Sequence, residues 1–498
     1  MGKKSIVALA VVAAGYLGTT WFLGEKTEEA YRQTIGEVNQ QLASFASITP
    51  EIQFSVEIKE YNRGFFSSDA VFEIGVGNGN DKSSFEYKEH IEHGPLPFEG
   101  VMRGELMPVL ARAQGQLVEN ESIKEWFDLV AKQGNIPVNT VTYIGFNTKG
   151  RTEINFSPID VEENFSSVKL SPAHFTINYD LLARDFNIDG ALPSFVMNEV
   201  KGDDETKVNM TIENIKLTTA AVGYGLPNGH NVTDFQIDKI QLDNTAVLTN
   251  LTVDSTEKVI DGISNIVANY NIEHVKFKEY DVGSMKAGIR ISRFNRAAVD
   301  KLQRLYMRSA DNAAAMNIVG ELLTPKPEFS LDNFHWKNNS GEINSSLSVQ
   351  FSMIDLAKVE SSIVGIVMGL VPHASYKMEF SRDMLADLLA FAEKETGESA
   401  EAQLAMFDVF TAILSEEKLV TLKDNKVLVD FTLDNGKVTL NGVEMTLQEL
   451  ADKLQRMAGL SQLDQAAEGA ETVEDFEDWE GYDEPMTETE AIEQAPLQ

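Results

Sequence analysis

The sequence predicts an α+β protein in which a single N-terminal transmembrane helix precedes a large, mostly antiparallel β-sheet body with interspersed helices. Three observations predict this class. One uncharged apolar run stands near the start of the chain, alternating apolar and polar residues recur through most of the rest, and only a few stretches show helical spacing. Alternation with a period of two indicates half-buried strands. Long series of hairpins with few helices indicate antiparallel pairing.

The N-terminal run predicts a membrane anchor. Residues 5–23, SIVALAVVAAGYLGTTWFL, carry no charge, and their length suits a helix that crosses a hydrocarbon core. Lys3 and Lys4 precede the run, so the positive-inside rule places the chain from Glu25 onward outside the cytoplasm. Cleavage as a signal peptide after residues 12–14, VAA, is the alternative. The apolar run continues beyond that site, which favours an uncleaved anchor.

Strand periodicity begins after residues 27–42, a polar stretch that we expect to form a helical stalk. In residues 52–58 apolar side chains alternate with polar ones, and the pattern continues in residues 72–76. Residues 77–81, GNGND, supply turn chemistry, and residues 85–91 resume the alternation. We therefore expect an antiparallel hairpin in this part of the chain.

Helices are predicted at a few places, and each is followed by a hairpin. Ser122 and Glu125 form a capping box for the first helix. Asn295 can cap a longer helix that ends near Leu323, and residues 384–392 and 404–414 predict two more. The hairpins that follow have Asn, Asp or Gly at their tips and span residues 140–156, 329–351 and 426–442.

The tail has a different composition from the body. Residues 461–498 contain thirteen acidic residues and no Lys or Arg, so self-repulsion predicts disorder. Phe476, Trp479 and Tyr482 are spaced by three within it and form a candidate partner-binding motif. A solvated tail with incidental aromatics is the alternative. The predicted domains are the anchor, a first β-rich lobe, a second hairpin-plus-helix lobe, continuous with the first or separate, and the tail: 1–24, 25–325, 326–460 and 461–498.

Composition and motifs argue against several chemistries. The formal net charge of −35 disfavours a broad basic surface for nucleic acid or anionic headgroups. The chain has no cysteine, hence no disulfide and no thiolate metal site. His90 and His93 form the one close histidine pair, and in a strand they point to opposite faces. We find no nucleophile elbow and no Walker loop, and we expect no catalytic residue, metal or cofactor.

One short stretch, YNRGFFSS at residues 61–68, needs a separate interpretation. Arg63 and Gly64 lie between Tyr61 and the pair Phe65 and Phe66. Gly64 permits a bend, and Arg63 can contact carbonyls or a carboxylate at that bend. The stretch is either a structural corner of the sheet or a recognition site.

Taken in order, several motifs resemble those of the YdgA-like family of bacterial envelope proteins, which is defined by a domain of unknown function. They are Gly15-Tyr16-Leu17-Gly18 in the anchor, the stretch at residues 61–68, His93-Gly94-Pro95 within residues 91–97, and Asn441-Gly442. The resemblance extends to about residue 450. It implies an anchor in a Gram-negative inner membrane and a periplasmic body, and it supplies no catalytic residue. The acidic tail is an addition to the family pattern.

The function expected from these observations is non-catalytic binding. We expect a membrane-tethered periplasmic protein that binds an amphiphile or a protein partner in envelope maintenance. The alternative is an envelope hydrolase that uses a pair of carboxylates, which would lie within about 10 Å of each other with one pKa raised. No feature of the sequence predicts an oligomeric state.

Overall fold

The computed structural model describes most of the body of the chain. The described residues are 39, 53–64, 67–78, 81–93, 100, 102–104, 109–121, 123–124, 127–128, 136–163, 166–180, 182–201, 206–306, 312–353 and 369–458.

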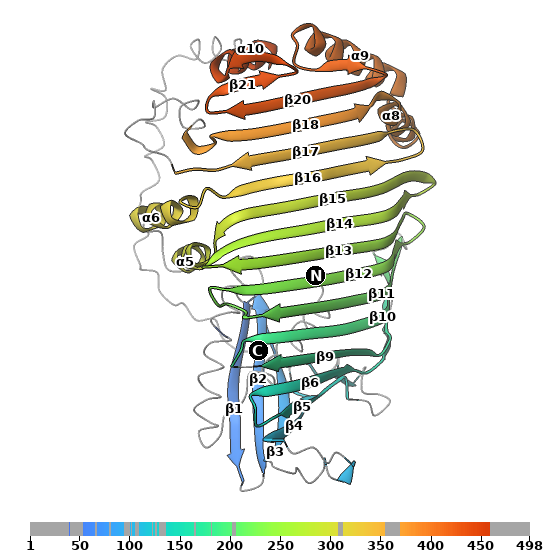
Figure 1. The fold of residues 1–498 in the computed structure, drawn as a ribbon. Coiled ribbons are helices and arrows are strands. Elements are labelled where there is room, and N and C mark those ends of the chain that lie inside the picture. Colours follow the sequence, from blue (N-terminus) through green and yellow to red (C-terminus); the bar gives the residue numbers. More distant parts are fainter. Residues whose placement is uncertain are drawn as a thin grey trace, which may run out of the picture.

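The described strands form one 22-stranded sheet in which the pairings are antiparallel (Figure 1). Its N-terminal part, which we call the N-terminal sheet, consists of β1 to β6. Each of these strands pairs with the next along the chain, as expected for successive hairpins. Their bounds are β1 Gln53–Arg63, β2 Ser67–Asn78, β3 Asp81–His93, β4 Ala111–Val118, β5 Val138–Ile144 and β6 Lys149–Phe156.

Longer strands extend the same sheet. Strand β6 pairs with β9, and β10 pairs with β9 along its first half and with β8 of the β7–β8 hairpin along its second. From β10 to β15 each strand pairs with its successor. The bounds are β7 Ile159–Glu163, β8 Ser166–Leu170, β9 Ala173–Asp180, β10 Asp185–Lys201, β11 Thr206–Val222, β12 Gly229–Leu242, β13 Ala246–Ile260, β14 Ile263–Phe277 and β15 Tyr280–Asn295.

The C-terminal part adds the remaining strands and all five helices that the structure delimits in its described residues. Strands β15 to β18 pair in order, and β18 pairs with β20. Their bounds are β16 Glu328–Lys337, β17 Glu342–Gln350, β18 His373–Ser381, β19 Thr421–Lys423, β20 Lys426–Asp434, β21 Lys437–Leu440 and β22 Val443–Thr446. The helices are α5 Arg296–Tyr306, α6 Asn312–Leu323, α8 Arg382–Thr396, α9 Ala400–Glu416 and α10 Leu447–Ala458.

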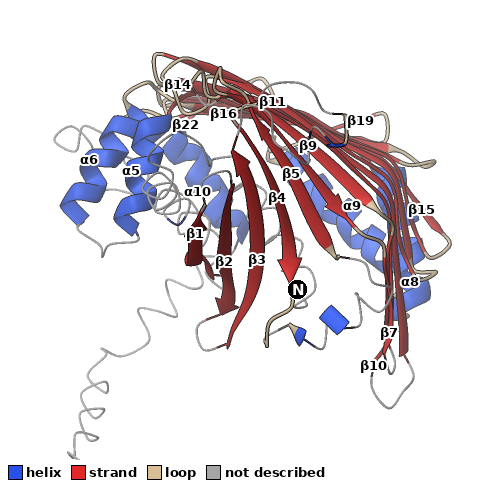
Figure 2. Ribbon diagram, turned by 90° about the horizontal axis from the view of Figure 1, so that it is seen from below, coloured by secondary structure: helices blue, strands red, loops and turns tan. Residues whose placement is uncertain are grey.

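A line of irregular positions crosses the long strands near their middle. The ladder of paired residues skips Pro193, Asn214, Asp238, Asn250 and Glu273 on five successive strands. Asn214 and Asn250 have φ values of 55° and 51°, which asparagine tolerates better than most residues. The long strands bend into an arch, with α5 and α6 at one side and α8 and α9 at the other (Figure 2).

The outer edge of β1 is partly closed by a side chain. Among the described strands β1 pairs with β2 alone. The Asn39 amide donates to the Val56 carbonyl and accepts from the Val56 N–H, both at 2.8 Å. The Asn39 side chain therefore makes the two hydrogen bonds that a neighbouring strand would make to Val56. This protects part of the edge, because unpaired strand edges can pair with other chains.

The predicted β-rich architecture is confirmed at the level of its elements. The predicted hairpins at residues 140–156, 329–351 and 426–442 are present as β5–β6, β16–β17 and β20–β21. Asn295 caps α5 by accepting from the Ala298 N–H at 3.2 Å, and the predicted long helix is described as α5 and α6.

The membrane anchor and the domain boundaries stay predictions. The span at residues 5–23 and the tail at residues 461–498 lie outside the described residues. In the part of the chain that the structure describes, no helix is both long and apolar enough to cross a membrane. The pairing of β15 with β16 carries the sheet across residue 325, where we expected the two lobes to meet.

Candidate functional site

The stretch at residues 61–68 forms the β1–β2 hairpin. Tyr61 and Arg63 lie in β1 opposite Ala70 and Ser68 of β2. The Gly64 N–H donates to the Ser67 carbonyl at 2.8 Å. A Cβ at Gly64 would lie 2.7 Å from that carbonyl oxygen, so the turn requires glycine because of close backbone approach.

The β1–β2 hairpin contacts His93, the first residue of the His93-Gly94-Pro95 motif. His93, the last residue of β3, lies 3.1 Å through its Nε2 from the Oγ of Ser68, which is almost fully buried. His90 lies on the opposite face and forms an ion pair with Asp69 at 2.6 Å. The structure thus brings Tyr61, Arg63, Gly64 and His93 to one corner of the N-terminal sheet. Phe65, Phe66, Gly94 and Pro95, which complete the predicted set, lie outside the described residues, and so do Phe476, Trp479 and Tyr482.

A buried ion pair reinforces this corner. The Arg112 guanidinium on β4 contacts Glu92 on β3 at 3.2 Å, and their side chains are 1% and 9% exposed. The guanidinium also lies 5.8 Å from the centre of the Tyr143 ring. Breaking a buried pair leaves an uncompensated charge, so this contact specifies the local packing strongly. The described geometry supports a structural corner, and a recognition role for it stays a prediction.

The other side of the N-terminal sheet is a closed apolar core. Alternate residues of β1 to β6 point to it, and Val56, Phe72, Ile91 and Ile154 are at most 2% exposed. Burial raises the pKa of Tyr87 well above its ordinary value, and the negative charge of Glu89 adds to the shift. Tyr87 therefore stays neutral and contributes to the packing of the core.

The same face of the sheet continues across the long strands as a row of apolar residues, one on each of ten neighbouring strands. Each member is directly opposite the next in the pairing register, so the row is unbroken from β10 to β20. At the usual spacing between strands it is about 43 Å long. We call it the apolar row: Leu192, Ile215, Ile237, Leu251, Ile272, Met285, Trp336, Ile343, Phe380 and Val427.

Among the described residues, no second layer covers the middle of this row. Ile237 and Val427 are buried, and the other eight members are only half-buried. Strands β11, β12 and β13 make substantial contacts with their sheet neighbours and with no other described helix or strand. At the C-terminal end α9 and α10 do cover the sheet, where Leu414, Leu447 and Leu450 pack with Leu433 and Val438. The apolar face is therefore closed at both ends and open between them.

Polarity increases along two neighbouring strands of the open part. On the face of the apolar row, β12 presents Ile237, Phe235, Thr233 and Asn231 in turn. Strand β13 presents their register partners Leu251, Val253, Ser255 and Glu257. At the polar end the Glu257 carboxylate accepts from Ser264 Oγ at 2.7 Å and from Arg296 at 3.4 Å. The buried Oδ1 of Asn231 has no hydrogen-bond partner among the described residues. Along these two strands the face therefore changes from apolar side chains at the apolar row to polar and charged side chains at Asn231 and Glu257.

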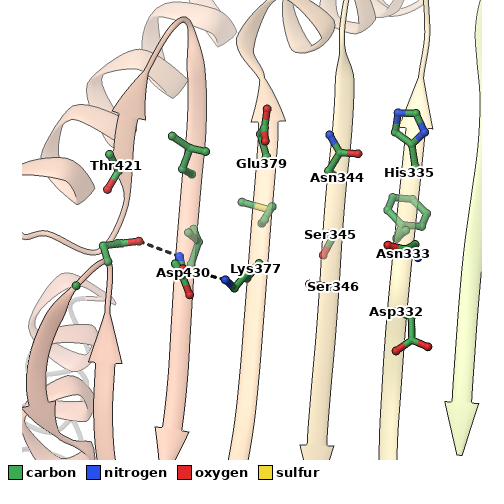
Figure 3. Close-up of a pocket in the computed structure, with 16 residues that line it drawn as sticks. Asp332, Asn333, His335, Asn344, Ser345, Ser346, Lys377, Glu379, Thr421 and Asp430 are labelled. Atoms are coloured by element: carbon green, nitrogen blue, oxygen red, sulfur yellow. Dashed lines mark hydrogen bonds and ion pairs between the residues drawn. The ribbon is translucent and has the colours of Figure 1, made fainter.

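A polar depression lies on the opposite face of the C-terminal strands. Its volume is about 490 Å³, and its lining includes Asp332, His335, Asn344, Lys377 and Glu379. Figure 3 shows these side chains on neighbouring strands, with Lys377 directed at Asp430, 3.3 Å away. The lining also contains Phe334, Met378, Leu428 and Val429. Its charged groups are held in ion pairs, Lys377 with Asp430, Asp332 with Arg290 and Glu379 with Lys426.

The carboxylates beside this depression are not arranged as an acid and a base. Lys426 Nζ contacts Glu342 at 3.1 Å and also contacts Glu379. Hydrogen bonds from Lys426 and His335 lower the pKa of Glu342. A general acid needs a raised pKa. Among the described carboxylates, those whose pKa departs clearly from its ordinary value all have a lowered pKa: Asp180, Glu342, Asp408 and Glu449. The hydrolase alternative thus gains no support here.

Sequence reasoning did not identify the apolar row. Alternation shows which residues of a strand are apolar, and several of these segments show it in the sequence. Which apolar residues lie side by side depends on the register of ten strands. Whether the resulting row is open depends on whether other elements pack over it. Neither is encoded locally in the chain.

Fold and site together define the class of protein, a β-rich protein built on one continuous antiparallel sheet with an open apolar face. The chain belongs to the family of bacterial proteins of unknown function called DUF945, whose model matches residues 1–448. The resemblance inferred from the motifs is thereby confirmed.

Two relatives from Escherichia coli K12 match the chain along most of its length. Protein YdgA is 24% identical, covering 90% of this chain and 96% of the relative. The uncharacterized protein YihF is 22% identical, covering 91% of this chain and 98% of the relative. An uncharacterized protein of Haemophilus influenzae is 25% identical over 36% of this chain. No solved structure matches the chain significantly.

Proposed function

We propose that this protein is a non-catalytic, membrane-tethered periplasmic protein that binds an amphiphile along the open part of its apolar face. The observation that carries the proposal is the apolar row, which is half-exposed and has no described second layer over β11 to β13. Large exposed apolar surfaces on soluble bodies mark binding sites. A row about 43 Å long suits extended hydrocarbon chains better than a compact ligand.

The polarity gradient supports an amphiphile rather than a purely apolar ligand. Acyl chains would contact Ile237, Leu251 and their neighbours in the apolar row. The polar end of the ligand would lie near Asn231 and Glu257, where Asn231 Oδ1 is a buried acceptor without a donor among the described residues. A headgroup that donates a hydrogen bond would satisfy this atom, and an unsatisfied buried acceptor carries a cost of about 1–3 kcal/mol.

The inner-membrane anchor brings the proposed site to its ligand. The run at residues 5–23 supports tethering, and a tethered body samples lipid at high effective concentration. Because the net charge is −35, we expect apolar contact, not capture of anionic headgroups, to supply most of the affinity.

Photocrosslinking in intact cells tests this proposal directly on the full chain. A benzophenone amino acid would replace Phe235, which is half-buried on the apolar face, and the irradiated protein would be digested and examined by mass spectrometry. We expect adducts with lipid masses, at least tenfold above those at the control position.

The control is Asp234, its neighbour on the same strand, which is exposed on the opposite face. Protein adducts at Phe235 in place of lipid adducts would replace the amphiphile with a protein partner. Equal lipid labelling at both positions, or none at either, would refute the proposed site.

A further inference from the structure

Helix α9 carries an apolar face that points to solvent. Met406, Val409, Phe410 and Ile413 are 70%, 62%, 55% and 47% exposed. Their spacing of three and four residues places them in one stripe along the helix. We call this stripe the α9 face. Between Glu401 and Glu416 it contains no exposed charged residue.

The opposite side of α9 is fixed to the body. Leu414 packs in the C-terminal core, and Phe407 meets Phe380 edge-on with ring centres 5.9 Å apart. Arg382 of α8 binds Asp408 through both carboxylate oxygens. These contacts set the rotation of the helix, so the α9 face cannot turn inward.

A membrane is a poor occupant for this face. Helices that lie in a bilayer interface usually carry Lys or Arg along their polar side. Helix α9, AEAQLAMFDVFTAILSE, contains neither, and the chain is strongly acidic. A covering group from a protein segment fits the face better.

We propose that the chain's own C-terminal segment covers the α9 face, with Phe476, Trp479 and Tyr482 as the contacting residues. The segment begins directly after α10, and α10 reaches the C-terminal end of α9 through one side chain. Lys453 of α10 donates to the Glu417 carbonyl, at the end of α9, at 3.0 Å, and both helices share the C-terminal core. Phe476 lies eighteen positions beyond Ala458, a reach of up to about 60 Å.

The chemistry of the two surfaces agrees. Three aromatic side chains spaced by three suit a hydrophobic stripe of similar length, since residues three apart lie on one side of a helix. Lys418 and Lys423, both exposed, follow α9, but the exposed Glu416 and Glu417 precede them, so apolar contact rather than charge would hold the segment. Because the segment is covalently attached, its effective concentration is in the millimolar range, so a weak intrinsic affinity suffices.

Disulfide trapping tests the proposal on the full chain, because the natural sequence has no cysteine and two introduced ones are unambiguous. The test variant carries Met406→Cys with Trp479→Cys. The control carries Glu444→Cys with Trp479→Cys, since Glu444 is exposed on the strand that precedes α10 and lies within the same reach. Under mild oxidation we expect the intrachain disulfide in the test variant to form at least tenfold faster.

Two further results decide between occupants. Replacing Phe476 and Tyr482 by Ser should reduce the trapping rate to that of the control. Equal rates in test and control would overturn the proposal. So would a mainly interchain product from Met406→Cys alone whose yield rises with protein concentration, because it would assign the face to a second copy.

Discussion

The N-terminal sheet and the long-strand region present the same face of one sheet in two different states. In the N-terminal sheet the alternate apolar residues are almost fully buried and form a core. In the long-strand region the corresponding residues are half-buried with no described layer above them. The alternating pattern is therefore identical in a core and in an open face, and the presence of a second layer decides which of the two it becomes.

The largest expected contrast comes from one truncation made in each region. Phe72 is 2% exposed in the N-terminal core. Phe72→Ala should lower the free energy of unfolding by about 4 kcal/mol, because it removes the transfer energy of the ring and leaves a cavity. Phe235→Ala on the open face should lower the free energy of unfolding by only about 1 kcal/mol, because water already reaches the Phe235 ring. Urea denaturation followed by circular dichroism measures both values. Equal losses would show that the long-strand face is covered in solution.

The buried ion pair gives a second contrast within the N-terminal sheet. Arg112→Met should lower the free energy of unfolding by about 3 kcal/mol, because the buried Glu92 loses the guanidinium as an ion-pair partner. The exposed pair of Arg290 and Asp332 on β15 and β16 provides the matched control. Arg290→Met should cost less than about 1 kcal/mol. A similar loss from both substitutions in urea denaturation would contradict the assigned burial.

The β1–β2 turn is expected to show a smaller effect. Gly64→Ala should cost about 2 kcal/mol, because the added Cβ meets the Ser67 carbonyl at 2.7 Å. Gly104 is the control, since no atom lies within 4 Å of a Cβ there and its cost comes only from a φ of 83°. Thermal denaturation compares the two. If Gly64→Ala proved the milder change, the described hairpin geometry would be wrong.

The smallest expected effect depends on pH. Since Lys426 and His335 lower the folded-state pKa of Glu342, the carboxylate stabilises the fold fully above its ordinary value of 4.5. This contribution is lost as the pH falls through the lowered value. Glu342→Gln should therefore cost less than about 1 kcal/mol near pH 7 and still less near pH 3. A penalty that grows on acidification, measured by urea denaturation at both pH values, would reverse the assignment.

Local patterns in the sequence account for most of the elements. Alternation at residues 52–58 and the turn at residues 77–81 predict the first strands, and Asn295 predicts the start of α5 because capping is a local interaction. The meeting of Ser68 with His93 depends on the register of β2 and β3, and turn chemistry sets that register only approximately. The α9 face looks like an ordinary core helix in the sequence, since its exposure depends on which side Leu414 and Phe407 hold against the sheet.

The order of pairing from β10 to β18 has a consequence for how such proteins vary. Every strand there pairs with its neighbour in the chain, so inserting or deleting one complete hairpin leaves the remaining pairings intact. Each such step would lengthen or shorten the sheet by about 10 Å. Members of the family can in this way differ in the length of the apolar face in units of one hairpin, while both ends of the sheet stay the same.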